Sequence, residues 1–394
     1  MPWKEVSSMG LRVEFVGLAG GKGAKVMALC RRFGISRKTG YKWLARYKQA
    51  GESGLADQSR RPHGSPTRTS AEIEELLVKA RQDHPAWGGR KLRVYLERRG
   101  ARELPAPSTI TEILRRRGLL DAAESVKHRP MQRFEHPTAN DLWQMDFKGH
   151  FGMENGQRCH PLTVLDDHSR FSLCLEACGN ERTDTVQQRL TATFRRYGLP
   201  RRILADNGSP WGGGDCREHP YTPLAVWLLR LDIAVSHGRP YHPQTQGKDE
   251  RFHRTLSLEL LSRRSFRDLP HCQEQFDPWR EEYNLHRPHQ ALDMQVPADR
   301  YLLSSREFPE QLPPVEYGDG SEVRRVNRGH VSIRRQRIQV GKAFDGYPVA
   351  MRATQTDGLL AVQFAHHTLG MVDLRDEQPR LQKVPSEHTA GGGT

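Results

Sequence analysis

The sequence has little of what marks several large classes of protein. Its six cysteines form no Cys-x-x-Cys pair, so neither a disulfide framework nor a zinc ribbon is indicated. It contains no run of about 18 apolar residues, and its first residues lack the apolar core of a signal peptide. We therefore expect reduced thiols and a soluble protein inside the cell.

Acidic residues are also scarce relative to basic ones. The chain has 61 Lys and Arg against 47 Asp and Glu, a formal net charge of +14. This excess favours a polyanionic partner, because each phosphate that a protein neutralises releases counterions. Nucleic acid is the first choice. An anionic membrane is the second, and the absence of a long apolar run weakens it. The length of 394 residues predicts roughly two to four domains.

Residues 1–62 have the pattern of a helix-turn-helix DNA-binding domain. Two helical segments within residues 26–48 are separated by Gly34, and Ser36 is a good N-cap for the second. Basic residues behind this cap alternate with apolar and aromatic ones, which leaves one face basic. The alternative is an ordinary helical hairpin with solvated lysines. The candidate DNA contacts here are Ser36, Arg37, Lys38, Thr39, Lys42 and Arg46.

Residues 63–132 repeat this organisation after a linker rich in Pro, Ser and Arg. Trp87-Gly-Gly-Arg-Lys-Leu92 is expected to open one helix and Pro107-Ser-Thr-Ile110 another, with Ser108 as its N-cap. Three arginines lie at the end of the second helix, where positive charges interact favourably with the helix dipole. The alternative is that each of them is simply solvated. Two tandem units can span a longer DNA site than one recognition helix covers. The candidate DNA contacts are Arg90, Lys91, Ser108 and Thr109.

From about residue 133 to 305 the pattern becomes α/β, and it places two acidic residues at strand ends. Apolar and polar residues alternate from Trp143 to Lys148, which puts Asp146 on the polar face of a strand. Ile203-Leu-Ala205 is typical of a buried parallel strand, and it delivers Asp206 to the strand's carboxyl end, where ligands collect in such sheets. The Asn-Gly that follows favours a tight turn.

A third acidic residue, Glu250, begins a later helix. Phe252, Leu256 and Leu260 form its apolar stripe; Asp249 lies about 20° from the stripe's centre and Glu250 about 120° away. Glu250 is therefore freer than Asp249 to face a polar cleft.

Three carboxylates gathered in one cleft of a basic protein imply bound divalent cations, and oxygen ligands suit Mg²⁺, with Mn²⁺ as a substitute. Two such ions about 4 Å apart can drive in-line displacement at a phosphodiester. We expect Asp146 to bridge both ions, Asp206 to hold one and Glu250 the other. Further candidate DNA contacts around this cleft are Lys148, Asn207, Tyr241, His242, Gln246, Lys248 and Arg251.

Residues 306–377 contain short β-like runs bounded by Gly and Asp, which predict a small β domain similar to a barrel. Six arginines make its first half basic. We expect about equally that this face contacts DNA without sequence specificity or that it is simply solvated. The tail, residues 378–394, is expected to be disordered.

The motifs together resemble those of bacterial insertion-sequence transposases of the Asp-Asp-Glu type, relatives of retroviral integrases. The resemblance runs from residue 1 to about 375. It implies a ribonuclease-H-like core with Asp146, Asp206 and Glu250 as catalytic metal ligands, cleavage at transposon ends and strand transfer into target DNA. It also implies a homodimer or larger multimer on double-stranded DNA in the bacterial cytoplasm, associated with the nucleoid. The motifs that carry it are Trp143-Gln-Met-Asp146, Thr163-Val-Leu-Asp-Asp-His-Ser-Arg170, Asp206-Asn-Gly208, Tyr241-His-Pro-Gln-Thr-Gln-Gly-Lys-Asp-Glu-Arg-Phe-His253 and Arg287-Pro-His-Gln-Ala-Leu292.

The chain departs from that family pattern around Glu250. The stretch between Asp206 and Glu250 is longer than usual, and residues 212–223 are expected to supply the excess as a loop. Asp249 stands where the family more often has an apolar residue, which leaves the register between Asp249 and Glu250 open. Two other functions compete: a DNA-binding regulator with a degenerate catalytic domain, and a nuclease that hydrolyses RNA in hybrids.

Overall fold

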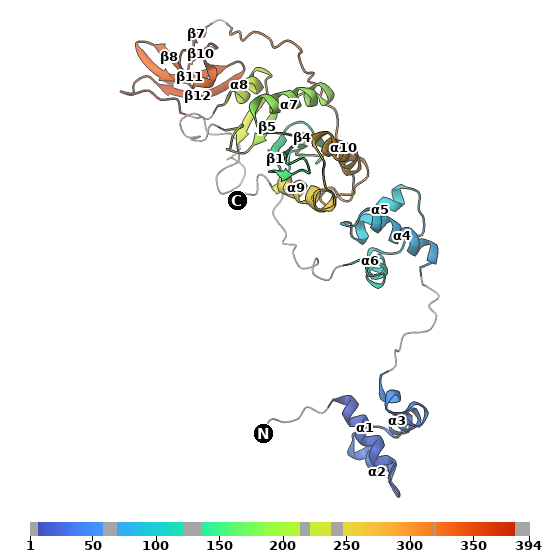
Figure 1. Cartoon of the computed structure of the whole chain (residues 1–394). Coiled ribbons are helices and arrows are strands. Elements are labelled where there is room, and N and C mark those ends of the chain that lie inside the picture. The colour runs from blue at the N-terminus through green and yellow to red at the C-terminus, as the bar shows by residue number, and fades with distance from the viewer. Residues whose placement is uncertain are drawn as a thin grey trace. The chain divides into compact units, whose positions relative to one another are not determined.

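A computed structural model describes residues 7–57, 69–120, 135–212, 221–237, 247–318 and 320–382 of the chain (Figure 1). Two compact units divide it, residues 1–68 and residues 69–394. Within the described ranges, no helix has both the length and the apolar character to cross a membrane. Tyr241, His242 and Gln246 lie outside these ranges, as do most of the expected loop at 212–223 and most of the tail.

The first unit is a three-helix arrangement closed by a short 3-10 turn. The Ser36 hydroxyl accepts a hydrogen bond from the Thr39 backbone N–H at 3.1 Å, so the N-cap prediction is confirmed. A Cβ on Gly40 would lie 2.5 Å from the Cys30 sulfur, which shows how closely the second and third helices pack. Phe15, Val16, Cys30, Trp43 and Leu55 form its core. The elements are α1 (Ser8–Ala19), α2 (Val26–Arg32), α3 (Arg37–Ala50) and η1 (Gly51–Leu55).

The second unit begins with another three-helix group: α4 (Ala71–Asp83), α5 (Gly89–Arg98) and α6 (Pro107–Arg116). Helix α6 starts at Pro107 with Ala106 as N-cap and without a side-chain capping bond. The prediction of Ser108 as the cap is therefore wrong, because the proline is already fixed for the first helical position and starts the helix earlier.

The arginines at the end of α6 tie it to α4. Arg116 and Arg117 reach the Glu74 carboxylate at 3.1 and 3.3 Å, and Glu74 is buried. These two arginines are part of the packing of the group, so neither is simply solvated.

A mixed β-sheet follows, with strand order β2-β3-β1-β5-β6 and β4 paired to β3. Strands β1, β5 and β6 run parallel, whereas β2, β3 and β4 pair antiparallel. Trp143 pairs with Ile203 across β1 and β5, so both strands end at the same edge of the sheet. The predicted parallel strand before Asp206 is thus confirmed. The bounds are β1 (Trp143–Phe147), β2 (Phe151–Gly152), β3 (Arg158–Asp166), β4 (Ser172–Cys178), β5 (Arg202–Ala205) and β6 (Ala234–His237).

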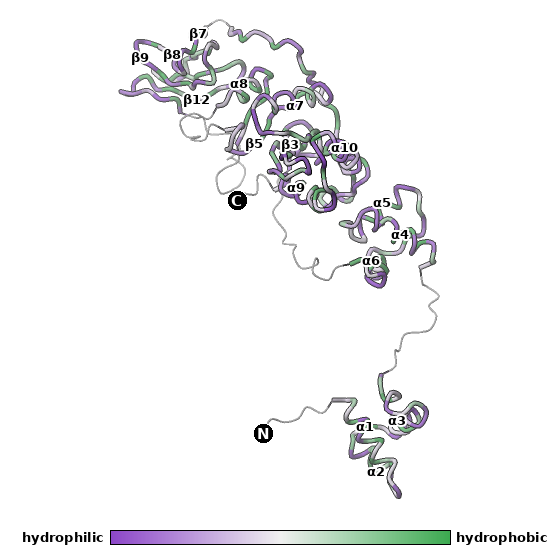
Figure 2. The backbone as a smooth tube through the Cα atoms, in the orientation of Figure 1, coloured by the Kyte–Doolittle hydropathy of each residue, from purple (hydrophilic) through white to green (hydrophobic). Residues whose placement is uncertain are grey.

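Helices cover both faces of this sheet. One core cluster joins β1 and β5 to α7 (Thr183–Tyr197) and α8 (Pro223–Arg230), through residues such as Phe194 and Trp227. Another joins β3 and β4 to α9 (Gly247–Glu259) and α10 (Leu269–Leu285), through residues such as Phe252 and Phe276. Hydropathy changes repeatedly along each helix in Figure 2, as expected for helices with one buried face. Short 3-10 turns lie at η4 (Leu261–Arg263), η5 (Gln290–Leu292) and η6 (Pro297–Asp299).

The C-terminal strands form the expected small β domain as two sheets, and within the described residues these sheets do not close into a barrel. One sheet has the order β12-β11-β10-β7, and β8 pairs only with β9. Arg328 and Gly329, both with positive φ, turn the chain between β7 and β8, and the two strands do not pair. The elements are β7 (Glu322–Arg325), β8 (His330–Ile333), β9 (Gln336–Gln339), η7 (Lys342–Phe344), β10 (Pro348–Ala353), β11 (Leu359–Phe364) and β12 (His367–Asp373).

The core between these two sheets includes residues of α8. Val226 and Leu229 on α8 are buried in the same cluster as Val331, Val349 and other strand residues. Helix α8 therefore packs on the main sheet with one side and on the C-terminal sheets with the other.

Candidate catalytic site

Asp146 lies at the end of β1, where side chains from β3 and α9 meet it. The Thr163 hydroxyl donates to the Asp146 backbone carbonyl at 2.9 Å and lies 2.8 Å from His253 Nε2. His253 Nδ1 is in turn 3.9 Å from the Asp146 carboxylate, whose side chain is 29% exposed. Three elements are thus linked around one partly open carboxylate.

The protonation of His253 follows from this arrangement. Thr163 has one hydroxyl proton and gives it to the Asp146 carbonyl, so the proton shared with His253 must be on Nε2. Burial, aided by the charge of Lys148, lowers the pKa of His253 to about 3. The ring is therefore neutral, with the Nδ1 lone pair on the side of Asp146, and brings no positive charge to this carboxylate.

The pKa values of Asp146 and Asp206 are both raised, and Asp206 is one cause of the shift at Asp146. Burial raises the pKa of Asp146 to about 7, and the negative charge of Asp206 raises it as well. Burial also raises the pKa of Asp206, against a hydrogen bond of 3.0 Å from the Gly208 backbone N–H to its carboxylate. Neither acid forms an ion pair with a lysine or arginine of the described ranges. Such a pair of acids suits a divalent cation, because the positive charge of the cation would stabilise the ionised form of both carboxylates.

Asp249 and Glu250 point in different directions from the first turn of α9. Asp249 is 2% exposed and its Oδ1 has no hydrogen-bond partner among the described residues. Burial, followed by the charges of Asp146 and Asp167, raises the pKa of Asp249 well above its usual range. Glu250 is exposed. The helical phase that places Asp249 on the apolar side of α9 is confirmed, and the role of Glu250 in a polar cleft stays a prediction.

The three predicted metal ligands are not all brought together. In the described part of the chain, no three His, Cys, Asp or Glu side chains form a group able to hold a metal ion. The structure places Asp146 near Asp206, and Glu250 stays on the outer side of α9. Residues 238–246, which lead into α9, lie outside the described ranges.

A fourth acidic residue near this pair was missed by the sequence analysis. The negative charge of Glu181, just before α7, contributes to the raised pKa of both Asp146 and Asp206. Its Oε1 lies 2.7 Å from His160 Nδ1 on β3. No periodicity or motif singles out Glu181, because only the fold brings the start of α7 to the end of β1.

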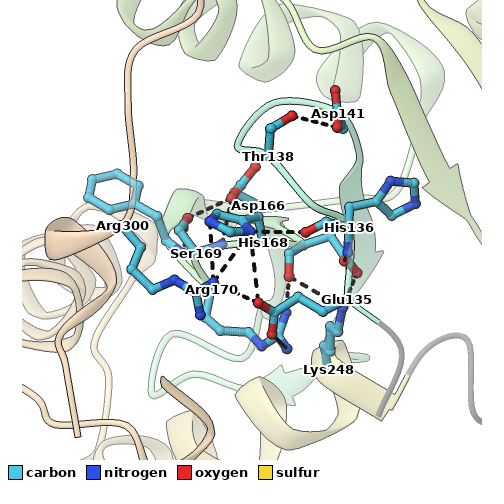
Figure 3. Close-up of polar contacts among 12 residues, drawn as sticks. Glu135, His136, Thr138, Asp141, Asp166, His168, Ser169, Arg170, Lys248 and Arg300 are labelled. Atoms are coloured by element: carbon cyan, nitrogen blue, oxygen red, sulfur yellow. Dashed lines mark hydrogen bonds and ion pairs between the residues drawn. The ribbon is translucent and has the colours of Figure 1, made fainter. Parts of the chain in front are cut away.

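The turn after β3, residues 166–170, forms a second acidic cluster (Figure 3), and it lies at the other end of β1, where Asp166 pairs with Trp143. The Asp166 carboxylate accepts hydrogen bonds from the Ser169 backbone N–H at 2.8 Å, the Ser169 hydroxyl at 2.6 Å and the Asn140 N–H at 2.8 Å. Asp167 is 1% exposed and accepts from Gln144 Nε2 at 2.7 Å and from the His136 N–H at 2.8 Å. Here every carboxylate oxygen has a partner.

Basic side chains complete this second cluster. Lys248 of α9 forms an ion pair with the Asp167 carboxylate, and its Nζ also lies 3.2 Å from the Asp167 carbonyl. Around the edge, Glu135 pairs with Arg170 at 3.1 Å and with Arg300 at 2.8 Å. Figure 3 shows these side chains converging from β-sheet, turn, helix and C-terminal connector.

The candidate DNA contacts of the first unit lie on α3. Ser36 is occupied as the N-cap, and Thr39 is half-buried behind it. Arg37, Lys38 and Lys42 are exposed. Lys42 and Arg46 lie 4.8 and 5.2 Å from the centre of the Trp43 ring, so part of each side chain covers that indole.

The candidates of the second unit divide into exposed and enclosed ones. Arg90, Ser108 and Thr109 are exposed, the last two on the first turn of α6. Lys91 is enclosed: burial, with the charge of Arg287, lowers its pKa to about 7.

Around the cleft the candidates also differ. Lys148 and Asn207 are half-buried beside Asp146 and Asp206, and Arg251 is exposed on α9. Lys248 is held by Asp167.

Family models match successive parts of this chain. A helix-turn-helix domain matches residues 11–63, and a homeodomain-like domain matches residues 39–114. Integrase core domains match residues 136–243 and 231–297, and the C-terminal domain of IS481 family transposases matches residues 321–380. The chain is an insertion-sequence transposase with an integrase-like core.

The chain is similar to two proteins of insertion elements and to one solved structure. It is 24% identical over 238 residues to an uncharacterized 31.7 kDa protein of insertion element IS407 from Burkholderia multivorans, covering 59% of this chain and 82% of the relative. It is 26% identical over 281 residues to an uncharacterized 39.2 kDa protein of insertion element IS476 from Xanthomonas euvesicatoria, covering 68% and 75%. A solved simian T-cell lymphotropic virus intasome, in complex with the PP2A regulatory subunit B56 gamma, matches with 15% identity and a TM-score of 0.38, covering 74% of this chain and 95% of that one.

Proposed function

We propose that this transposase cuts DNA strands at the ends of its insertion sequence and transfers the 3′-hydroxyl ends into target DNA. The observation that carries the proposal is the pair Asp146 and Asp206 at the carboxyl ends of parallel strands, with raised pKa values and no Lys or Arg ion pair within the described ranges. The two helical groups before the core would bind the terminal inverted repeats, and the protein would act as a homodimer or larger multimer in the bacterial nucleoid.

The residues available suit divalent metal. Asp146, Asp206 and Glu250 would hold two Mg²⁺ or Mn²⁺ ions. When bound, these ions activate the attacking oxygen and stabilise the departing one. The chain's own part is positioning: Thr163 fixes the end of β1, and neutral His253 leaves the Asp146 charge for a cation. Lys148, Asn207 and Arg251 surround this site and would hold the DNA backbone.

Two other functions predict different behaviour. A regulator with a degenerate catalytic domain would bind the ends and never cut them. A nuclease for RNA hybrids would have little use for two groups of DNA-reading helices, so we rank it lowest.

The test is a cleavage and strand-transfer assay on transposon-end DNA with Mg²⁺, comparing neighbours in α9. Glu250→Gln should lower the rate by about 10³-fold or more while end binding persists, because it removes a metal ligand. Asp249→Asn is the matched control, one residue away but buried, and should retain cleavage. Loss with Asp249→Asn and not with Glu250→Gln would exchange their roles. Wild-type protein that binds ends without nicking them would favour the regulator.

A further inference from the structure

Asp167 connects the two elements that carry proposed metal ligands. Its Oδ1 accepts a hydrogen bond from Gln144 Nε2 at 2.7 Å, and the same carboxylate pairs with Lys248. Gln144 stands two positions before Asp146 on β1, and Lys248 stands two positions before Glu250 on α9. The buried Asp167 carboxylate thus contacts both Gln144 and Lys248, and each of these stands two positions before a proposed metal ligand.

The bridge is held rigidly on both sides. Asp167 is 1% exposed, and its second oxygen accepts from the His136 backbone N–H at 2.8 Å. Its own backbone N–H donates to the Leu142 carbonyl at 2.9 Å, which extends the pairing of β3 with β1. The Lys248 ammonium, on a side chain only 16% exposed, also lies 3.2 Å from the Asp167 carbonyl. A lysine enclosed in this way costs much free energy unless it keeps its carboxylate partner.

We propose that Asp167 is a positioning residue that anchors the amino-terminal turn of α9 through Lys248 and so sets where Glu250 lies relative to Asp146. The proposal rests on the proposed function, because it gives Glu250 its role as a metal ligand. It also assigns Lys248 to the anchor instead of to a DNA phosphate. The two roles of Lys248 predict different results, since a phosphate contact contributes to DNA affinity and its salt dependence, whereas an anchor contributes to the rate.

Asp166 provides a matched control for Asp167. It is the neighbouring residue and equally buried, and its carboxylate is hydrogen-bonded to Ser169 and Asn140. None of the hydrogen bonds or ion pairs recorded for its carboxylate involves α9. Asp166→Asn therefore reproduces the loss of a buried charge in this turn without touching the anchor.

The experiment uses the full-length protein and four variants: Asp167→Asn, Lys248→Met, Lys248→Arg and Asp166→Asn. Asp167→Asn and Lys248→Met should each lower kcat for end cleavage by about tenfold to a hundredfold, because small misplacements of catalytic groups have effects of this size. Both should weaken Mn²⁺ binding, measured by the EPR signal of free Mn²⁺, and leave the dissociation constant for end DNA within about twofold. Lys248→Arg keeps the charge and should recover part of the rate. The double variant Asp167→Asn/Lys248→Met should be no worse than the poorer single one.

Hydrogen exchange keeps this test separate from that of the function. Amides of residues 247–259 should exchange faster in Asp167→Asn and Lys248→Met than in wild type or Asp166→Asn, with or without metal. If Asp167→Asn and Asp166→Asn have the same α9 exchange and the same Mn²⁺ affinity, the anchor is wrong. Weakened DNA binding with unchanged kcat in Lys248→Met would also overturn it, in favour of a phosphate contact. The proposed function would be contradicted if the wild-type protein neither binds Mn²⁺ nor cuts ends. The anchor would still be supported if α9 exchanges faster in Asp167→Asn and Lys248→Met than in wild type.

Discussion

Two acidic clusters lie at opposite ends of β1, Asp146 and Asp206 at its carboxyl end and Asp166 and Asp167 beside its first residue, Trp143, and they differ in what surrounds them. In the turn after β3, both carboxylates of Asp166 and Asp167 accept several hydrogen bonds, and Asp167 has a lysine partner as well. Asp146 and Asp206 have raised pKa values and, within the described ranges, no ion pair with a lysine or arginine, although Asp206 accepts a hydrogen bond from the Gly208 N–H. We call the first cluster satisfied and the second unsatisfied, because the second lacks such an ion pair and is available to a cation.

The strongest test of this difference is the loss of activity in the unsatisfied cluster. Asp146→Asn and Asp206→Asn should each reduce end cleavage by about 10³-fold or more, since each removes a negative charge that positions metal at the reacting phosphate. End binding, measured by gel shift, should remain within a few-fold of wild type. Substantial cleavage by either variant would place the reaction elsewhere.

The satisfied cluster should respond in stability. Asp167→Leu leaves Lys248, Gln144 Nε2 and the His136 N–H without their acceptor, so it should cost about 3 kcal/mol or more in the unfolding of the core. Denaturant melts followed by tryptophan fluorescence would measure it. Glu310→Ala, which breaks the exposed pair of Glu310 with Arg195, is the control and should leave the melt unchanged. Equal melts for both variants would contradict the comparison.

The pH dependence of the metal-free protein tests the unsatisfied cluster again. The pKa of Asp146 is about 7 in the fold against an ordinary value of 3.8. Its proton therefore favours the folded state at low pH, and this contribution is lost as pH rises from about 4 to about 7. We expect roughly 2 kcal/mol of loss, smaller than the full shift because the side chain is partly open to solvent. Melts in EDTA across this range should show a steeper decline for wild type than for Asp146→Asn, and Mn²⁺ above pH 7 should reverse it. Parallel curves would show that Asp146 keeps an ordinary pKa.

The smallest effect concerns Asp249, a third kind of acid that is buried without a partner for Oδ1 in the described residues. Asp249→Val should raise the free energy of unfolding by roughly 1 kcal/mol, because it removes a buried polar group whose desolvation destabilises the fold. Thermal melts would show the gain, with Glu250→Val on the exposed side of the turn as the control. A loss of stability would mean that Asp249 has a partner that matters to the fold.

The sequence predicted the elements that follow from local patterns. Ser36 has capping chemistry and caps α3, and the apolar run before Asp206 is a buried parallel strand. Helical phase placed Asp249 on the apolar side of α9. Each of these depends on neighbours within a few residues, which sequence periodicity reports directly.

What the sequence did not indicate depended on contacts between distant residues. Lys248 and Asp167 are 81 positions apart, so nothing local distinguishes this lysine from one that faces DNA. Gln144 shares the polar face of β1 with Asp146, yet it is buried, because the turn after β3 covers it. Barrel closure likewise depends on which edges pair, and the turn at Arg328 and Gly329 separates β7 from β8.

The burial of Val226 and Leu229 against the C-terminal strands affects how the protein is made. A ribosome releases α8 long before β10, β11 and β12, so during synthesis the outer side of α8 has nothing to pack against. A nascent catalytic half therefore exposes an apolar surface until the last strands emerge. The proposed catalytic centre would then mature late, after the two amino-terminal helical groups have already folded.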